Sequence, residues 1–173
     1  MTIRVGINGF GRIGRNFYRA AKKAGADIDF VAVNDLGSVD TMAHLLRYDS
    51  VLGRLDYDIE ATADGIKVDG DVLQVLAVRD PKELPWSDLG VDVVVESTGF
   101  FTSRDKAAAH LDAGAPFVIV SAPSSSTLTM GTKQLVVQDA LDTTLWVAGS
   151  NASSLTPTTK VASAPDEGAD TIT

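Results

Sequence analysis

The stretch VGINGFGRIGR, residues 5–15, carries the strongest fold signal in the sequence. Gly9, Gly11 and Gly14 match the pattern G-x-G-x-x-G, which follows the apolar run IRVGIN and opens a helical pattern. A strand, a glycine-rich turn and a helix in this order let the backbone approach a diphosphate, which the free amides and positive dipole end of the helix can hold. The spacing alone is weak evidence in a chain with 15 glycines, but its place between strand and helix predicts a dinucleotide-binding turn.

Strand-like runs alternate with helical patterns along the chain. Each of IRVGIN, IDFVAVND and VDVVVEST is followed by a helical pattern, and FVIVSAP returns to a strand. This alternation predicts an α/β fold, a Rossmann-type doubly wound and mostly parallel sheet. Residues 56–78 alternate with period two around ADG and VDGD, which predicts a short antiparallel insertion. We expect one domain over residues 1–155 and a flexible tail over 156–173, and the strand order between 125 and 150 stays open.

Glycines mark the ends of two predicted helices. Gly25 is expected to end the first helix, and Gly114 to end a third helix over about 103–113. The first helix should pack flat on the sheet through apolar residues at helical spacing, namely Ile13, Phe17, Ala20, Ala21 and Ala24.

Composition excludes several classes of function. The net charge of −8 argues against binding nucleic acid or an anionic membrane, since both would repel the chain. No cysteine is present, so disulfides and thiolate chemistry are excluded, and two histidines are too few for a typical zinc site. The start MTIRVGING lacks the pattern of a signal peptide, and no run approaches the roughly 20 apolar residues of a membrane span. We therefore expect a cytoplasmic protein without a metal site.

Asp35 supplies the second half of the dinucleotide fingerprint. It ends the run FVAVND, on the strand that follows the glycine-rich turn and its helix. A carboxylate there accepts hydrogen bonds from the adenosine ribose hydroxyls and repels a 2′-phosphate, so NAD is favoured over NADP. The alternative is that the glycines form a simple turn and that Asp35 only caps the next segment.

Seven motifs, taken in order, resemble the N-terminal half of the phosphorylating glyceraldehyde-3-phosphate dehydrogenases. They are VGINGFGRIGR at 5–15, AVNDL at 32–36, HLLRYDSVLGR at 44–54, VRDP at 78–81, ESTGFFT at 96–102, SAPS at 121–124 and GSNAS at 149–153. The resemblance is close over residues 1–123, faint in the next stretch and clear again at SNAS. It implies an NAD-binding Rossmann domain of a glycolytic oxidoreductase.

The resemblance also implies where NAD would bind. It places Arg12 and Ile13 at the pyrophosphate, Asp35 on the adenosine ribose and Arg79 near the adenine. Ser97, Thr98 and Gly99 would lie beside the cofactor where the strand order reverses, and Ser121 near the nicotinamide ribose. Without the resemblance, Arg79 would be interpreted as a surface charge, and residues 97–99 as a turn at the end of a strand. The full set of expected NAD-binding residues is Asn8, Gly9, Phe10, Gly11, Arg12, Ile13, Gly14, Asn34, Asp35, Leu36, Arg79, Ser97, Thr98, Gly99 and Ser121.

The catalytic loop departs from the family. The family's loop reads Ser-Asn-Ala-Ser-Cys-Thr-Thr-Asn with a nucleophilic cysteine, whereas this chain reads SNASSLTP, which puts Ser154 in the nucleophile's place and Pro157 in that of the asparagine. A serine hydroxyl ionises far less than a thiol and needs an adjacent base. The position of the family's histidine would fall beyond Thr173, and His44 and His110 are expected to be surface or packing residues.

Three functions therefore stay open. The first is an NAD-binding domain without dehydrogenase activity. The second is an active oxidoreductase subunit that uses Ser154 or joins a separate catalytic chain. The third is a non-enzymatic scaffold or partner protein. The family's final helix and catalytic domain have no counterpart in this sequence, so we expect an apolar groove that the tail, a homo-oligomer or a partner chain covers.

Overall fold

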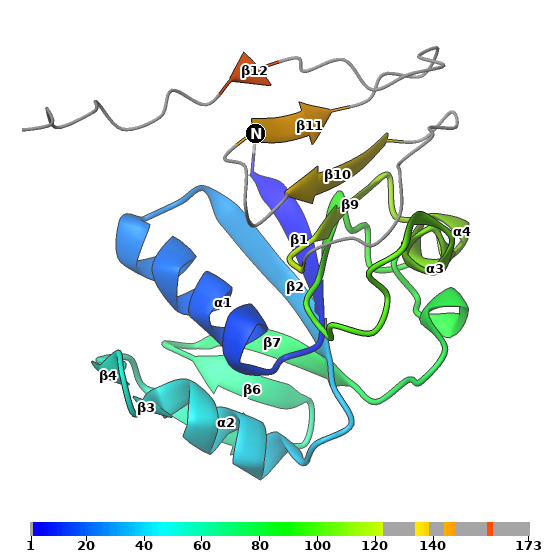
Figure 1. Cartoon of the computed structure of the whole chain (residues 1–173). Coiled ribbons are helices and arrows are strands. Elements are labelled where there is room, and N and C mark those ends of the chain that lie inside the picture. The colour runs from blue at the N-terminus through cyan, green and yellow to red at the C-terminus, as the bar shows by residue number, and fades with distance from the viewer. Residues whose placement is uncertain (1, 123–133, 139–143, 148–158, 161–173) are drawn as a thin grey trace, which may run out of the picture.

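The computed structural model describes residues 2–122, 134–138, 144–147 and 159–160. Within these residues the chain builds one 10-stranded sheet with helices on both faces, and a separate two-stranded hairpin (Figure 1). The strand order is β12-β11-β10-β9-β8-β1-β2-β7-β6-β5. Because β2 lies on one side of β1 and β8 on the other, the strand order reverses at β1, as in a doubly wound fold.

The central strands are parallel. They are β10 (Gln134–Gln138), β9 (Phe117–Val120), β8 (Val93–Glu96), β1 (Ile3–Asn8), β2 (Ile28–Asn34) and β7 (Asp71–Leu76). Antiparallel strands extend both edges, with β11 (Thr144–Val147) and β12 (Thr159–Lys160) at one and β6 (Gly65–Val68) and β5 (Ile59–Thr62) at the other. The predicted Rossmann-type sheet is confirmed, and so is the antiparallel insertion. Its last strand, β7, pairs with β2 and joins the insertion to the main sheet.

The helices cover the two faces of the sheet. On one face lie α1 (Arg12–Ala24) and α2 (Val39–Arg47), and on the other lie the 3₁₀ turn η1 (Pro81–Glu83), α3 (Arg104–Ala107) and α4 (Ala109–Asp112). The hairpin of β3 (Tyr48–Asp49) and β4 (Gly53–Arg54) follows α2. The third predicted helix is present as α3 and α4, which meet at Ala108.

Two hydrophobic clusters form the core, one on each face. Tyr18, Phe30 and Leu46 belong to the cluster under α1 and α2, whereas Trp86 and Val118 belong to the cluster under α3 and α4. Neighbouring residues of a strand point to opposite faces, so that β2 and β8 contribute to both clusters, whereas β1 contributes Val5 and Ile7 to the first. Burial on both faces explains why these strands are continuous apolar runs.

Helix α1 ends as predicted but is rotated from the predicted face. Gly25 adopts φ 60°, and the amides of Gly25 and Ala26 donate to the carbonyls of Lys22 and Ala21, which is a Schellman motif. The predicted stripe is wrong at three positions, because the side chains of Ile13, Ala20 and Ala24 are exposed. The buried residues are Gly14, Tyr18, Arg19 and Ala21. The physical reason is the contact of Gly14 with β1, which fixes the rotation of the helix at its first turn.

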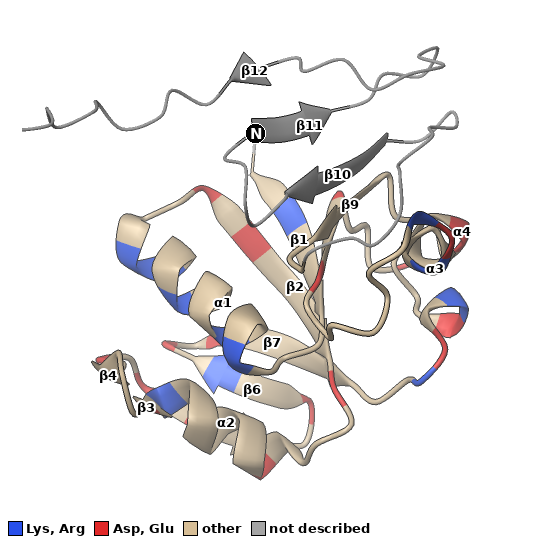
Figure 2. Cartoon of the chain, in the orientation of Figure 1, with Lys and Arg blue, Asp and Glu red and all other residues tan. Residues whose placement is uncertain are grey.

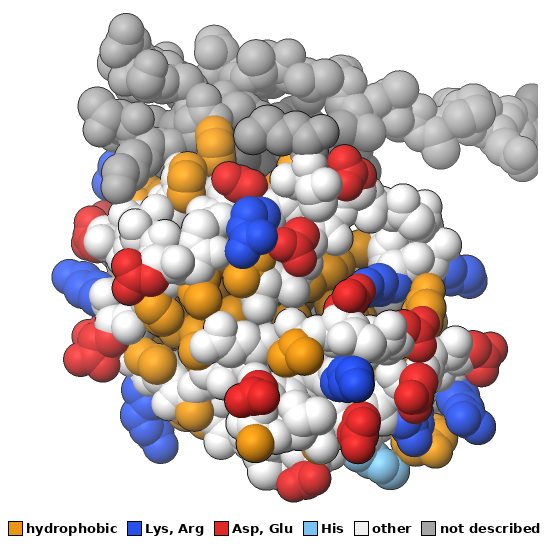
Figure 3. Space-filling view, turned by 180° about the vertical axis from the view of Figure 1, so that it is seen from behind, with side chains coloured by type: hydrophobic (Ala, Val, Ile, Leu, Met, Phe, Trp, Pro, Cys, Tyr) orange, Lys and Arg blue, Asp and Glu red, His pale blue; other side chains and the backbone are white. Residues whose placement is uncertain are grey.

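Charge is dispersed over the surface. Figure 2 shows that basic residues follow the outer side of α1, and Figure 3 shows Lys, Arg, Asp and Glu side chains interspersed on the opposite side of the molecule. In the described part of the chain no helix is long and apolar enough to cross a membrane. The same residues contain no group of three or more His, Cys, Asp or Glu side chains that could hold a metal ion.

Candidate functional site

A pocket of about 400 Å³ opens at the carboxyl ends of β1, β2 and β8, where the strand order reverses. In an open α/β sheet this edge is where ligands bind. The pocket collects residues that are far apart in the sequence because parallel strands end at the same edge. Its lining residues are Asn8, Gly9, Gly11, Asn34, Asp35, Leu36, Val78, Arg79, Ser97, Thr98, Phe100 and Phe101.

The three motif glycines have three different surroundings. Gly9 adopts φ 90°, and a Cβ on it would lie 2.6 Å from the backbone nitrogen of Thr98. A Cβ on Gly14 would lie 2.3 Å from the carbonyl oxygen of Gly9 and 3.0 Å from the side chain of Ile7. A Cβ on Gly11 would meet no described atom within 4 Å, although Gly11 lines the pocket. The first glycine thus makes the turn, the third brings α1 onto β1, and the second leaves space on the pocket side.

The N-terminus of α1 presents unpaired amides. Gly11 is its N-cap residue, and no side chain among the described residues caps it or places an acid in its first turn. The positive end of the helix dipole therefore stays uncompensated. The guanidinium of Arg15 donates to the carbonyl oxygen of Phe10 at 2.7 Å. Burial lowers the pKa of Arg15, and the Asp35 carboxylate opposes that shift.

Asp35 follows the last residue of β2 and is half-buried at the pocket. Its backbone amide donates to the carbonyl oxygen of Leu76 at 2.9 Å, which fixes it beside β7. One carboxylate oxygen, Oδ1, accepts from the amide of Gly37 at 3.0 Å. The hydrogen bond orients the side chain and leaves acceptor capacity on both oxygens for a ligand.

Apolar side chains border the pocket near Asp35. Leu36 is 54% exposed and Phe100 is 76% exposed. Both line the pocket, together with Phe101 and the exposed Arg79. Flat apolar surface beside hydrogen-bonding groups suits a ligand with a planar base.

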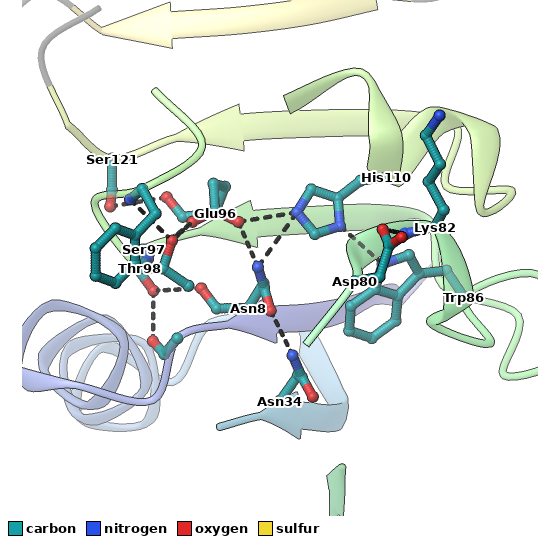
Figure 4. Close-up of polar contacts among 12 residues, drawn as sticks. Asn8, Asn34, Asp80, Lys82, Trp86, Glu96, Ser97, Thr98, His110 and Ser121 are labelled. Atoms are coloured by element: carbon teal, nitrogen blue, oxygen red, sulfur yellow. Dashed lines mark hydrogen bonds and ion pairs between the residues drawn. The ribbon is translucent and has the colours of Figure 1, made fainter. Parts of the chain in front are cut away.

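A buried polar network lies beneath the pocket (Figure 4). Glu96 is 1% exposed, and its Oε2 lies 2.5 Å from Nδ2 of Asn8 and 2.8 Å from Nε2 of His110. Its Oε1 accepts from the amide of Thr98 at 2.8 Å and from the Thr98 hydroxyl. The indole of Trp86 donates to Nδ1 of His110 at 3.1 Å. The buried carboxylate is therefore fully hydrogen-bonded, as burial of a charge requires.

The predicted residues fall into two groups. Nine of them line the pocket: Asn8, Gly9, Gly11, Asn34, Asp35, Leu36, Arg79, Ser97 and Thr98. The other six lie elsewhere. Phe10 is buried in the core, Arg12 and Ile13 are exposed on the first turn of α1, and Gly14 is buried beneath that turn. Gly99 is exposed with φ 77°, and the hydroxyl of Ser121 donates to the carbonyl oxygen of Glu96 at 3.0 Å. Ser154 and Pro157 lie outside the described residues.

Sequence reasoning missed Val78, Phe100 and Phe101 in the pocket lining and the partners Trp86, Glu96 and His110 beneath it. The sequence did contain one signal for the buried network, because a glutamate that ends a run of buried valines needs hydrogen-bond partners. Of the two histidines, His44 is exposed on α2 beside Tyr48, and His110 is buried in the core.

Comparison with known proteins gives consistent matches. Residues 3–104 match the family model described as glyceraldehyde 3-phosphate dehydrogenase, NAD binding domain. Glyceraldehyde-3-phosphate dehydrogenase 1 of Streptomyces avermitilis is 56% identical over 159 residues, which cover 90% of this chain and 46% of that protein. The enzyme of Geobacillus stearothermophilus is 55% identical, over 78% of this chain and 41% of that protein. The chromosomal enzyme of Cupriavidus necator is 48% identical, over 92% of this chain and 49% of that protein. The chain thus spans a little under half the length of these relatives.

Proposed function

This chain belongs to the glyceraldehyde-3-phosphate dehydrogenase family through its NAD-binding domain, and from that premise we propose that its pocket binds NAD without dehydrogenase activity of its own. The observation that carries the proposal is the contrast among the motif glycines. Gly9 and Gly14 are enclosed by backbone, whereas Gly11 faces open space at a helix N-terminus. This is the arrangement that a diphosphate needs, because its oxygens must come close to backbone amides.

The diphosphate would lie on the first turn of α1. The free amides of that turn donate hydrogen bonds, and the helix dipole offsets the repulsion expected from a chain of net charge −8. Arg12 and Ile13, both exposed there, would flank the diphosphate. Gly14 would support the turn from below, and Phe10 would anchor it in the core.

The adenosine half would occupy the pocket proper. The free acceptor sites of Asp35 would bind the ribose hydroxyls, and Leu36 and Phe100 would enclose the flat adenine between them. Arg79, exposed at the rim, would lie near the adenine. Ser97, Thr98 and Gly99 would border the cofactor after β8, with Ser121 on the nicotinamide side.

The proposed lack of activity rests on Ser154. NAD would supply the hydride acceptor, but attack on an aldehyde carbonyl requires a nucleophile of the chain. The sequence contains no cysteine, and a serine hydroxyl needs a partner base to attack a carbonyl. Residues 1–155 would then form the binding domain, with 156–173 as a tail.

Turnover is tested by incubating the chain with glyceraldehyde 3-phosphate, inorganic phosphate and NAD while following NADH absorbance. We expect no rate above that of a blank without protein. A rate that disappears in Ser154→Ala would show instead that the chain is an oxidoreductase acting through Ser154. A scaffold role would be indicated if calorimetry detects no NAD binding. Light scattering measures the molar mass in solution and so tests the predicted homo-oligomer. Mixing this chain with a catalytic chain of the family tests whether the two form a complex.

A further inference from the structure

Four donor groups converge on the buried carboxylate of Glu96, two on each oxygen. Oε2 faces Asn8 and His110, and Oε1 faces the amide and the hydroxyl of Thr98. Glu96 ends β8, Asn8 ends the adjacent β1, and the two residues are register partners in the sheet. The carboxylate therefore joins two strand ends directly beneath the pocket.

Trp86 determines which nitrogen of His110 carries the proton. The indole N–H can only donate, so Nδ1 of His110 must accept and is unprotonated. The proton then lies on Nε2, which donates to Glu96. His110 is thus neutral, because a proton on Nδ1 would oppose the indole N–H. Trp86 is itself fixed, since it is fully buried and packs on the backbone of Gly6, where a Cβ would lie 2.7 Å from the indole ring.

The network continues from Glu96 to the pocket surface. The Thr98 hydroxyl donates to Glu96, and its oxygen accepts from the amide of Phe100 at 3.1 Å. Thr98 and Phe100 both line the pocket. On the other side, Asn8 Oδ1 accepts from Asn34 at 2.7 Å, and Asn34 also binds both backbone groups of Val78. Three segments of the pocket lining are therefore held through one buried carboxylate.

We propose that Glu96 is a positioning residue for the pocket's ligand, acting through Thr98 and Asn8 without touching that ligand. The orientation of Glu96 is itself set by the hydrogen bonds from Trp86 to His110 and from His110 to Glu96. The inference rests on the proposed function, which makes the ligand NAD. The segment that Glu96 holds most directly, residues 98–100, belongs to the adenosine half of the proposed site. Loss of the carboxylate should therefore weaken AMP and NAD to the same degree.

A carboxylate is the only side chain of this size that fits the donor pattern. It accepts on both oxygens, whereas glutamine accepts on one and presents an N–H₂ group on the other. In Glu96→Gln the N–H₂ group would face either the Thr98 amide or the donors of Asn8 and His110, so the Thr98 turn or the Asn8 amide would have to move. Glutamine has nearly the same size as glutamate. A change in ligand affinity would therefore result from displaced pocket residues and not from a change in side-chain volume.

The experiment measures the Kd for NAD and for AMP by calorimetry in the full chain and in Glu96→Gln. We expect both constants to rise about tenfold or more, the scale of a lost hydrogen bond to a charged group. Asp92→Asn is the matched control. It makes the same change just before the other end of β8, where Asp92 accepts from the amide of Arg4 at 2.9 Å, and it should leave both constants unchanged.

A second pair of variants decides the question if Glu96→Gln does not fold. Thr98→Val removes the hydroxyl from the half-buried turn and should weaken AMP and NAD as Glu96→Gln does, whereas Thr98→Ser keeps the hydroxyl and should retain binding. Nitrogen-15 NMR of His110 should show the proton on Nε2. Unchanged Kd values in a folded Glu96→Gln or in Thr98→Val, or a proton on Nδ1, would overturn the inference. A wild-type chain that does not bind NAD would instead overturn the proposed function.

Discussion

The side-chain amide of Asn34 donates a 2.7 Å hydrogen bond to Oδ1 of Asn8, across the ends of β2 and β1. The two residues are also register partners, and the amide of Gly9 donates to the carbonyl oxygen of Asn34 at 2.8 Å. The glycine-rich turn begins directly after Asn8, and Asp35 follows Asn34. These hydrogen bonds hold the turn and the carboxylate at a fixed separation before any ligand is bound, which lowers the entropy cost of binding.

Asp35→Ala should weaken NAD binding by more than about 1 kcal/mol, because it removes hydrogen bonds between a carboxylate and the ribose hydroxyls. Calorimetry with NAD measures the change. Asp64→Ala, which removes an exposed carboxylate from the turn between β5 and β6, controls for the change in net charge. Equal affinities of the two variants would refute the assignment of Asp35.

NADP should bind at least about tenfold more weakly than NAD, because its 2′-phosphate would lie against the Asp35 carboxylate. Competition of both nucleotides for the same site gives the ratio. In Asp35→Ala the preference should shrink, since the repelling charge is gone. If NADP binds the wild-type chain as tightly as NAD, the exposed Arg79 or Arg12 is compensating and the proposed role of the carboxylate is wrong.

Gly11→Ala and Gly14→Ala should separate ligand binding from folding. Gly11 has φ −70°, which alanine adopts, and open space around it. The unfolding free energy of the Gly11→Ala variant should therefore fall by less than about 1 kcal/mol. The new methyl group should nevertheless block the diphosphate and abolish detectable NAD binding. Gly14→Ala places a methyl group against the carbonyl oxygen of Gly9 and should destabilise the fold by about 1–3 kcal/mol.

Urea unfolding and NAD calorimetry on both variants provide the check. A Gly11→Ala variant that binds NAD normally would contradict the placement of the diphosphate. A Gly14→Ala variant as stable as the wild-type chain would contradict the close packing of α1 on β1.

The sequence predicted the parts of the fold that local patterns determine. The alternation of apolar runs and helices, the antiparallel insertion and the end of α1 at Gly25 depend on residues close in the chain, and the structure confirms them. The buried face of α1 was predicted wrongly, because its rotation depends on the contact of Gly14 with Ile7 on another element. Periodicity alone could not supply that contact.

The candidate site shows the same division. Asp35 and the glycines could be predicted because their spacing in sequence reflects one strand, turn and helix. Trp86, Glu96 and His110 come together only when β8 pairs with β1 and α4 packs over them, so no spacing rule relates them. Phe10, a predicted cofactor-binding residue, is fully buried, since the turn itself directs that side chain into the core.

The most direct test of the central claim is a titration of the nitrogen-15-labelled chain with NAD, followed by amide NMR. The account predicts saturable chemical-shift changes at the amides of residues 9–14, at Asp35 and at residues 97–100, all with one Kd. In the same titration of Gly11→Ala, the chemical shifts of these amides should not change. Absence of shifts in the folded wild-type chain, or shifts confined to residues away from the ends of β1, β2 and β8, would contradict it.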